Sequence, residues 1–283
     1  MFNVPRAGRY KLRRPPLVQA LVQVRYPLSA QFQRLADVAE IQAKLAHILP
    51  YMAQSESQLV SMAIGGGEAS PSESSISSAS SILWRFSDDK SWSFVLEPSI
   101  ATLAVGSDYE GMDDFADRFS EVLSVLADSG DFRRCERIGV RYVNHVDIPP
   151  GMTGNWTEWF KPELTGWSGT TLLGEGADLT SDITQSQFRY RPVESFATTP
   201  GDIHSLIHFG LLPPGTLVDL NPPRTLKQNA YLLDVDMFIQ ANQNFEVTNL
   251  VAQFRLLHEQ IDSFFRWSLT EQGAEHFGLE EVI

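Results

Sequence analysis

Two amphipathic helices limit the folds open to this chain, because the apolar stripe of each needs a broad apolar surface to cover. The first is predicted over about 112–127, with acidic residues outside its stripe, and the second over about 246–268. A run of short strands with turn signals between them precedes each helix. A sheet with one face covered by a long helix accommodates both patterns. The sequence therefore predicts an α+β fold built on antiparallel sheets.

The order of the predicted elements occurs twice. Strands at 17–26 and 137–148 open the two halves, and each is followed by a helix, several strands and one of the long helices. Both opening strands contain Val-Arg-Tyr, at 24–26 and 140–142. We therefore expect two tandem related units with the order β-α-β3-4-α, similar to TBP-like and helix-grip folds, over 17–130 and 134–283. The spacing differs between the paired strands and the paired helices, so this prediction depends mainly on element order.

Two further segments have the composition of loops. Residues 65–81 begin with three glycines and are rich in serine, and residues 165–176 are rich in glycine. Such stretches have too little apolar surface to offset the entropy lost on ordering, so a mobile loop is expected at 65–81 and a second loop at 165–176.

Charge and cysteine content narrow the functional classes. The net charge of −13 disfavours nucleic-acid binding by the body of the protein. The N-terminal arm, residues 1–16, contains several basic residues and has two possible interpretations. It is either a loose chain end or a segment that binds an anionic partner such as a nucleic acid. The basic residues are Arg6, Arg9, Lys11, Arg13 and Arg14. The single cysteine and the absence of a signal-like or membrane-spanning apolar run favour a cytoplasmic protein.

Several segments resemble a sporadically distributed family of uncharacterised bacterial proteins of about this length. The segments are Pro15-Pro16, Trp84-Arg-Phe, RIGVRYVNHVDIP at 137–149, LLDVDMF at 232–238, Leu257-His258 and Phe264-Phe265. The resemblance implies a common fold with strands and helices in these places. It implies no activity and no catalytic residues.

The strand at 137–148 has the most informative alternation. Arg137, Arg141, His145 and Asp147 fall on one face, which could bind an anion or supply acid–base groups. The alternative is a solvent-facing strand whose charges pair with neighbouring strands. Asn144 falls on the opposite, apolar face, where a buried amide must find partners.

Asp234 and Asp236 lie two residues apart on a predicted strand and so share a face. Paired carboxylates can form an acid–base pair or part of a metal site, and the alternative is an exposed strand face. No metal is expected, because further ligands are not identifiable and His204 and His208 are too far apart on a strand to share one. No cofactor is expected either, since the phosphate-cradling glycine motifs are absent.

The leading functional expectation is a non-catalytic binding or regulatory protein that presents a concave sheet surface to a protein or small-molecule partner. The alternative is an enzyme acting on an anionic small molecule at the polar face of strand 137–148. In that case Arg141 would bind the anion and His145 would act as acid or base.

Overall fold

The computed structural model describes residues 10–61, 77–130, 132–148, 156–166, 183–190, 200–218 and 223–281. Most of the two predicted loops, residues 65–76 and 167–176, lies outside these ranges, as do the first nine residues of the basic arm.

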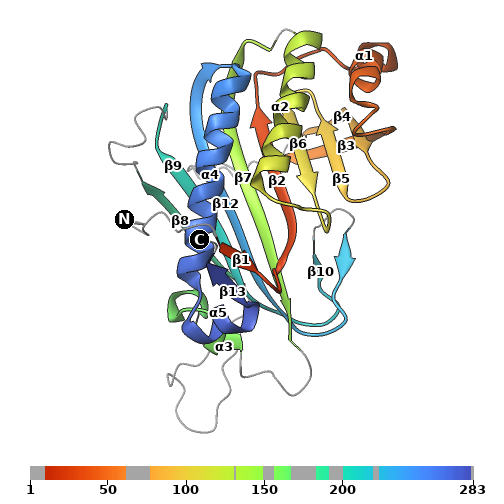
Figure 1. The fold of residues 1–283 in the computed structure, drawn as a ribbon. Helices are drawn as coiled ribbons and strands as arrows, with labels where there is room; N and C mark the ends of the chain where they lie inside the picture. The colour runs from red at the N-terminus through yellow and green to blue at the C-terminus, as the bar shows by residue number, and fades with distance from the viewer. Residues whose placement is uncertain are drawn as a thin grey trace, which may run out of the picture.

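A nine-stranded sheet forms the centre of the molecule, and every pair of neighbouring strands in it is antiparallel (Figure 1). The prediction of an α+β fold built on antiparallel strands is therefore confirmed. In spatial order the strands are β3 (Tyr51–Ser61), β4 (Ser77–Ser87), β5 (Trp92–Leu96), β6 (Ile100–Val105), β2 (Leu17–Arg25), β7 (Arg134–Asp147), β12 (Ala230–Asn244), β9 (Ile203–Leu212) and β8 (Ile183–Tyr190).

The two halves of the chain meet where β2 pairs with β7 in the middle of this sheet. On one side β6, the last strand of the first half, lies next to β2. On the other side β12 lies next to β7. The halves thus share one continuous sheet, and the finer prediction of two related tandem units is not confirmed by this arrangement.

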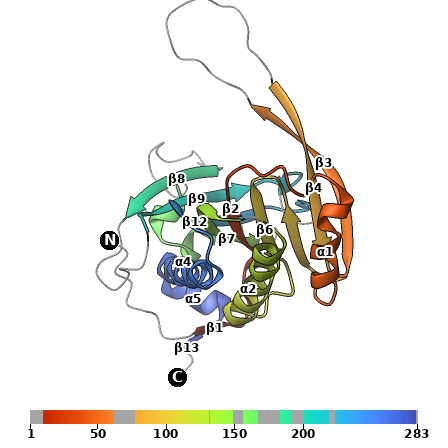
Figure 2. The ribbon, with the colours of Figure 1, turned by 90° about the horizontal axis from the view of Figure 1, so that it is seen from above.

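Two long helices cover one side of the sheet, which we call the helix face. They are α2 (Met112–Ser129) and α4 (Val247–Ser268), and they lie side by side (Figure 2). Phe254 of α4 is fully buried, and its ring lies 5.1 Å from that of Phe115 and 5.5 Å from that of Phe119 on α2. The apolar stripes predicted from the sequence therefore meet each other as well as the sheet.

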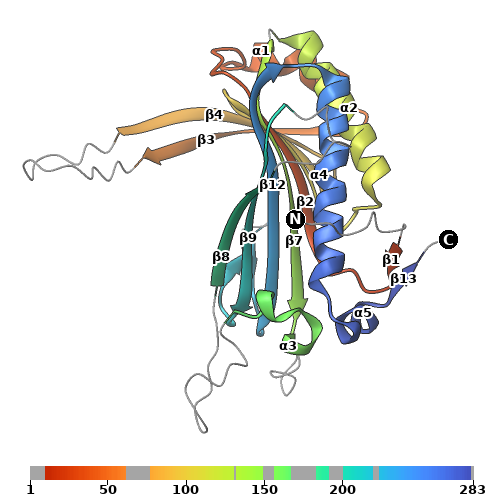
Figure 3. The ribbon, with the colours of Figure 1, turned by 90° about the vertical axis from the view of Figure 1, so that its left-hand side faces the viewer.

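The opposite side of the sheet is the open face. Figure 3 shows α2 and α4 on one side of the central strands, and none of the described helices lies over β7, β12 and β9 on the other side. The β3–β4 hairpin projects toward this open side. A third helix, α1 (Leu35–Leu45), packs beside α2 through Val38, Ile41 and Leu45.

Short elements close the ends of the fold. They are β1 (Tyr10–Leu12), paired with β13 (Leu279–Glu281), β10 (Leu217–Val218), paired with β11 (Arg224–Thr225), and the helical segments α3 (Trp156–Trp159), Pro162–Leu164 and α5 (Glu271–Phe277). Strands of two or three residues carry too little pattern to be predicted. None of the helices in the described ranges is long and apolar enough to cross a membrane.

The described part of the basic arm is anchored, which corrects the reading of a loose chain end for residues 10–14. Besides the β1–β13 pairing, Arg13 forms an ion pair with Glu280 at 2.9 Å. Arg14 donates a hydrogen bond to the carbonyl oxygen of Glu275. The acidic C-terminal segment is thus a partner for these arginines within the chain itself.

Truncation of Phe254 tests how far the contact between α2 and α4 supports the fold. Phe254→Ala should lower the free energy of unfolding by about 4 kcal/mol, because it removes a fully buried ring and leaves a cavity between the two helices. Chemical denaturation measures the change. Leu217→Ala is the control, since this side chain is 67% exposed and should cost about 0.5 kcal/mol or less. Equal losses in the two variants would contradict the assignment of the core.

Candidate functional site

The strand register places one residue of each strand in a row across the open face. The row passes through Thr102 on β6, Gln23 on β2, Gly139 on β7, Phe238 on β12 and His204 on β9. It continues to Arg189 on β8 and, on the other side, through β5 to Arg85 on β4. Because side chains alternate between faces, all of these residues lie on the side away from α2 and α4.

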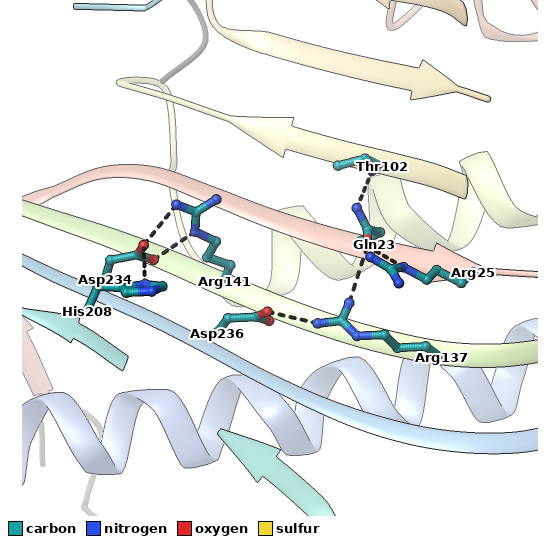
Figure 4. A network of polar contacts seen from close by, with 8 residues as sticks. All are labelled: Gln23, Arg25, Thr102, Arg137, Arg141, His208, Asp234 and Asp236. Carbon is teal, nitrogen blue, oxygen red and sulfur yellow. Dashed lines mark hydrogen bonds and ion pairs between the residues drawn. The ribbon is translucent and has the colours of Figure 1, made fainter. Parts of the chain in front are cut away.

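The guanidinium of Arg137 occupies the gap that Gly139 leaves in this row. A methyl group on Gly139 would lie 2.6 Å from a guanidinium nitrogen of Arg137. From this position Arg137 donates hydrogen bonds to Gln23 at 3.3 Å and to Asp236 at 2.8 Å (Figure 4). Its guanidinium also lies 4.1 Å from the ring centre of Phe238, a distance at which a cation is attracted to an aromatic face.

Contacts on both sides extend this arrangement over five strands. Gln23 donates to the hydroxyl of Thr102 and also accepts a hydrogen bond from Arg25 (Figure 4). On the other side, the imidazole of His204 stacks on Phe238 with ring centres 5.1 Å apart. We call the set Thr102, Gln23, Arg137, Phe238 and His204 the central row.

A second ion pair lies beside the central row. Both oxygens of Asp234 accept hydrogen bonds of 2.8 Å from Arg141, which is the bidentate geometry that suits a guanidinium and a carboxylate. His208 approaches the same carboxylate at 3.4 Å from β9 (Figure 4). The side chain of Asp234 is only 5% exposed, whereas that of Arg141 is 34% exposed. A pocket of about 240 Å³ lies here, between these strands and the segment Thr216–Val218.

Burial determines the electrostatics of the central row. It raises the pKa of Asp236 above the ordinary value even though Arg137 is 2.8 Å away, because removal from water disfavours the charged carboxylate more than the arginine favours it. Removing these two charges from water costs free energy. The ion pair therefore stabilises the fold less than apolar side chains with the same buried area would.

The distribution of charge differs between the two sides of the molecule. Five arginines and three aspartates of the strands lie on the open face. This face therefore has more basic than acidic strand residues, although the net charge of the whole chain is −13. Helix α2 alone contains five acidic residues and one arginine. The open-face residues are Arg25, Arg85, Arg137, Arg141 and Arg189, and Asp147, Asp234 and Asp236.

His145 lies apart from this network. Its side chain is 1% exposed, its Nε2 atom is 3.6 Å from Asp147, and burial lowers its pKa. Asp147 in turn approaches Arg224 at 3.7 Å. His145 lies four residues along β7 from Arg141.

A second polar cluster lies on the helix face, and the sequence interpretation missed most of it. The hydroxyl of Tyr142 is 2.7 Å from Nδ1 of His258 on α4 and 2.9 Å from the hydroxyl of Tyr109. Burial lowers the pKa of His258 to about 4, so the imidazole is neutral near pH 7.

This second cluster lines a cavity of about 400 Å³ between β1, β2, β7, α4 and the segment Gly106–Glu110. Asp262 of α4 accepts a hydrogen bond of 2.8 Å from the hydroxyl of Tyr10, and burial raises the pKa of its carboxyl group. Asn144 also lines the cavity and donates to the carbonyl oxygen of Leu233. Asn144 on an apolar face was the one signal in the sequence that pointed here.

The predicted site residues thus belong to two separate places. The structure brings Arg141 together with Asp234, and Asp236 together with Arg137, all on the open face. Asn144 lies on the helix face, and His145 contacts neither group. Among the described residues, no three His, Cys, Asp or Glu side chains are placed to hold a metal ion.

No protein-family model matches the chain, and the search of curated proteins gives no match.

The Arg141–Asp234 pair can be tested by removing one partner or both. Asp234→Ala should lower the free energy of unfolding by about 3 kcal/mol, because it leaves a half-buried guanidinium without its carboxylate. The double change Arg141→Met/Asp234→Leu should recover most of that loss, since apolar side chains of similar size replace both charges. Denaturant titration of the three proteins measures both effects. A double variant less stable than Asp234→Ala would show that the pair itself stabilises the fold.

The lowered pKa of His258 predicts a pH dependence of stability. Between its value of about 4 in the folded protein and its ordinary value of 6.5, the unfolded chain binds more protons than the folded one. This histidine therefore contributes a slope of about 1.4 kcal/mol per pH unit in that range, with stability falling as pH falls. His258→Gln should reduce the slope of the measured unfolding free energy between pH 4.5 and 6.5. An unchanged slope would contradict the assignment of a neutral His258.

Proposed function

We propose that the protein is a non-catalytic binding or regulatory protein that receives a protein partner on the open face. The observation that carries the proposal is the central row: ordered polar and aromatic side chains on a broad sheet surface that none of the described helices covers. Such a surface presents guanidinium groups in fixed positions, which favours recognition of carboxylates.

The dimensions of the open face favour a protein over a small molecule. The pocket beside Arg141 and Asp234, at about 240 Å³, is smaller than the roughly 300–1,000 Å³ of typical small-molecule sites. The central row, in contrast, extends over five strands, and the β3–β4 hairpin projects on the same side of the sheet. A partner of protein size can contact the row and the hairpin together.

The charge pattern defines the surface that the partner presents. Arg25 is exposed at the end of β2, and the side chain of Arg189 is 68% exposed on β8. Arg25 lies on a central strand of the sheet and Arg189 on its edge strand, and both face the open side. A partner with acidic side chains near both would complement the open face, and the acidic helix side would repel it.

The alternative, an enzyme acting on an anionic small molecule at strand 137–148, has weaker support. Arg141 is held by both oxygens of Asp234, and the side chain of His145 is almost completely buried. Residues four apart on one strand are also roughly 13 Å apart, which is too far to act on one reacting bond.

The proposal includes an origin of the fold by tandem duplication, in line with the TBP-like and helix-grip arrangement expected from the sequence. The order of pairing supports it: β2 followed by β6 and β5 corresponds to β7 followed by β12 and β9. The long helices α2 and α4 end the respective halves. A cytoplasmic location, which suits the single cysteine, also belongs to the proposal.

Charge reversal on the open face tests the proposed function. Arg25→Glu and Arg189→Glu should each reduce capture of the partner by tenfold or more and leave the fold intact, because both side chains are exposed. The matched control is Lys44→Glu on α1, which makes the same change of charge on the helical side and should capture as wild type does. Affinity capture with quantitative mass spectrometry compares the four baits.

Cross-linking of the captured complex then locates the contact. Cross-links from the partner to the open face, together with weaker capture at higher salt, would agree with the proposal. A partner retained equally by all four baits, or cross-linked to α2 and α4, would overturn it.

A further inference from the structure

The cavity on the helix face lies apart from the open face. Residues from distant parts of the chain surround it: the segment Tyr10–Leu12 and residues 15–17, the segment Gly106–Glu110, Tyr142 and Asn144 of β7, and four residues of α4. Its volume of about 400 Å³ lies within the range of small-molecule sites. The α4 residues are His258, Ile261, Asp262 and Phe265.

Aromatic rings form much of the wall. Tyr10, Tyr109, Tyr142 and Phe265 line the cavity, and the rings of Tyr109 and Tyr142 meet edge to face at 5.8 Å. Aromatic rings arranged around a cavity attract a positively charged group through the negative potential of their faces. They also provide the apolar surface that the alkyl part of an organic cation needs.

The charge of the lining has the sign that a cation requires. The neutral groups in the wall are the tyrosines, whose pKa values burial raises, and His258, whose pKa burial lowers to about 4. The charged groups are Asp262 inside the cavity and the exposed Lys11 and Glu110. These two exposed charges cancel, which leaves the carboxylate of Asp262.

The neighbours of Asp262 do not replace a bound cation. Tyr10 donates one neutral hydrogen bond to it. Arg266 lies one turn further along α4 and lowers the pKa of Asp262, but its guanidinium forms an ion pair of 2.6 Å with Glu281. Glu259 acts in the opposite direction to Arg266. Burial remains the largest influence, so the carboxyl group is held in a poorly solvated position where a cation would stabilise its charged form.

We propose that this cavity binds a small organic cation, an amine or a quaternary ammonium compound, with Asp262 as its counter-ion and the rings of Tyr10, Tyr109 and Tyr142 around it. The Tyr109–Tyr142–His258 hydrogen bonds hold two of these rings in place. An anion is excluded, because the carboxylate of Asp262 repels it.

Calorimetric titration with four probes tests the proposal on the full-length protein. The cationic probes are methylammonium, tetramethylammonium and choline, and the fourth is 3,3-dimethylbutan-1-ol, which has the shape of choline without its charge. At least one cation should bind at least tenfold more tightly than the alcohol. No binding of any cation, or equal binding of choline and the alcohol, would overturn the proposal.

Substitutions in the cavity identify the groups responsible. Asp262→Asn keeps the shape of the side chain and should weaken cation binding at least tenfold, whereas Glu259→Gln, an exposed neutralisation on the same helix, should not. Tyr109→Phe keeps the ring and should retain binding, and Tyr109→Leu should lose it, which gives a second measure if Asp262→Asn does not fold. Wild-type affinity in both Asp262→Asn and Tyr109→Leu would contradict the assignment. Neither variant alters the open face, so the outcome does not depend on the partner proposed there.

Discussion

The pairing of β2 with β7 is the contact on which the rest of the structure depends. It runs from Leu17 opposite Asn144 to Arg25 opposite Arg137 and joins the two halves of the chain into one sheet. Because side chains alternate along each strand, this single register decides what faces α2 and α4 and what faces the open side. A shift by one residue would place Val22 and Val24, which are fully buried, on the open face, so the apolar core holds the register in place.

The open face has a different energetic character from the core. Arg137 and Asp236 are mostly buried by their neighbours in the sheet, although no described helix covers them, and burial raises the pKa of the aspartate. Apolar side chains at these positions would stabilise the fold at least as well. An ordered set of such residues over five strands is what the proposed recognition of a partner would require. Gly139, which has no side chain, leaves room for the guanidinium of Arg137 on the sheet.

Alternation alone predicted which residues share a face, but it did not predict their partners. The sequence placed Arg137 and Arg141 on one face of their strand, and Asp234 and Asp236 on one face of theirs. Their pairing depends on the register of β7 against β12, which is not visible in either strand alone. The Tyr142–His258 contact depends on the position of α4 across the sheet, and the β1–β13 pairing joins segments more than 260 residues apart. Contacts of this range carry no local pattern, so the cavity that they enclose could not be predicted.

Strand β7 contributes to both candidate sites through adjacent residues. Arg141 points to the open face and Tyr142 to the helix face, so the sheet itself separates the two sites by the thickness of its backbone. The charges follow the same division, with arginines on one side and the carboxylate of Asp262 on the other. An acidic protein surface suits the first side and an organic cation suits the second. The acidic partner proposed for the open face and the organic cation proposed for the cavity differ in the sign of their charge, so we expect each to be confined to its own side of the sheet.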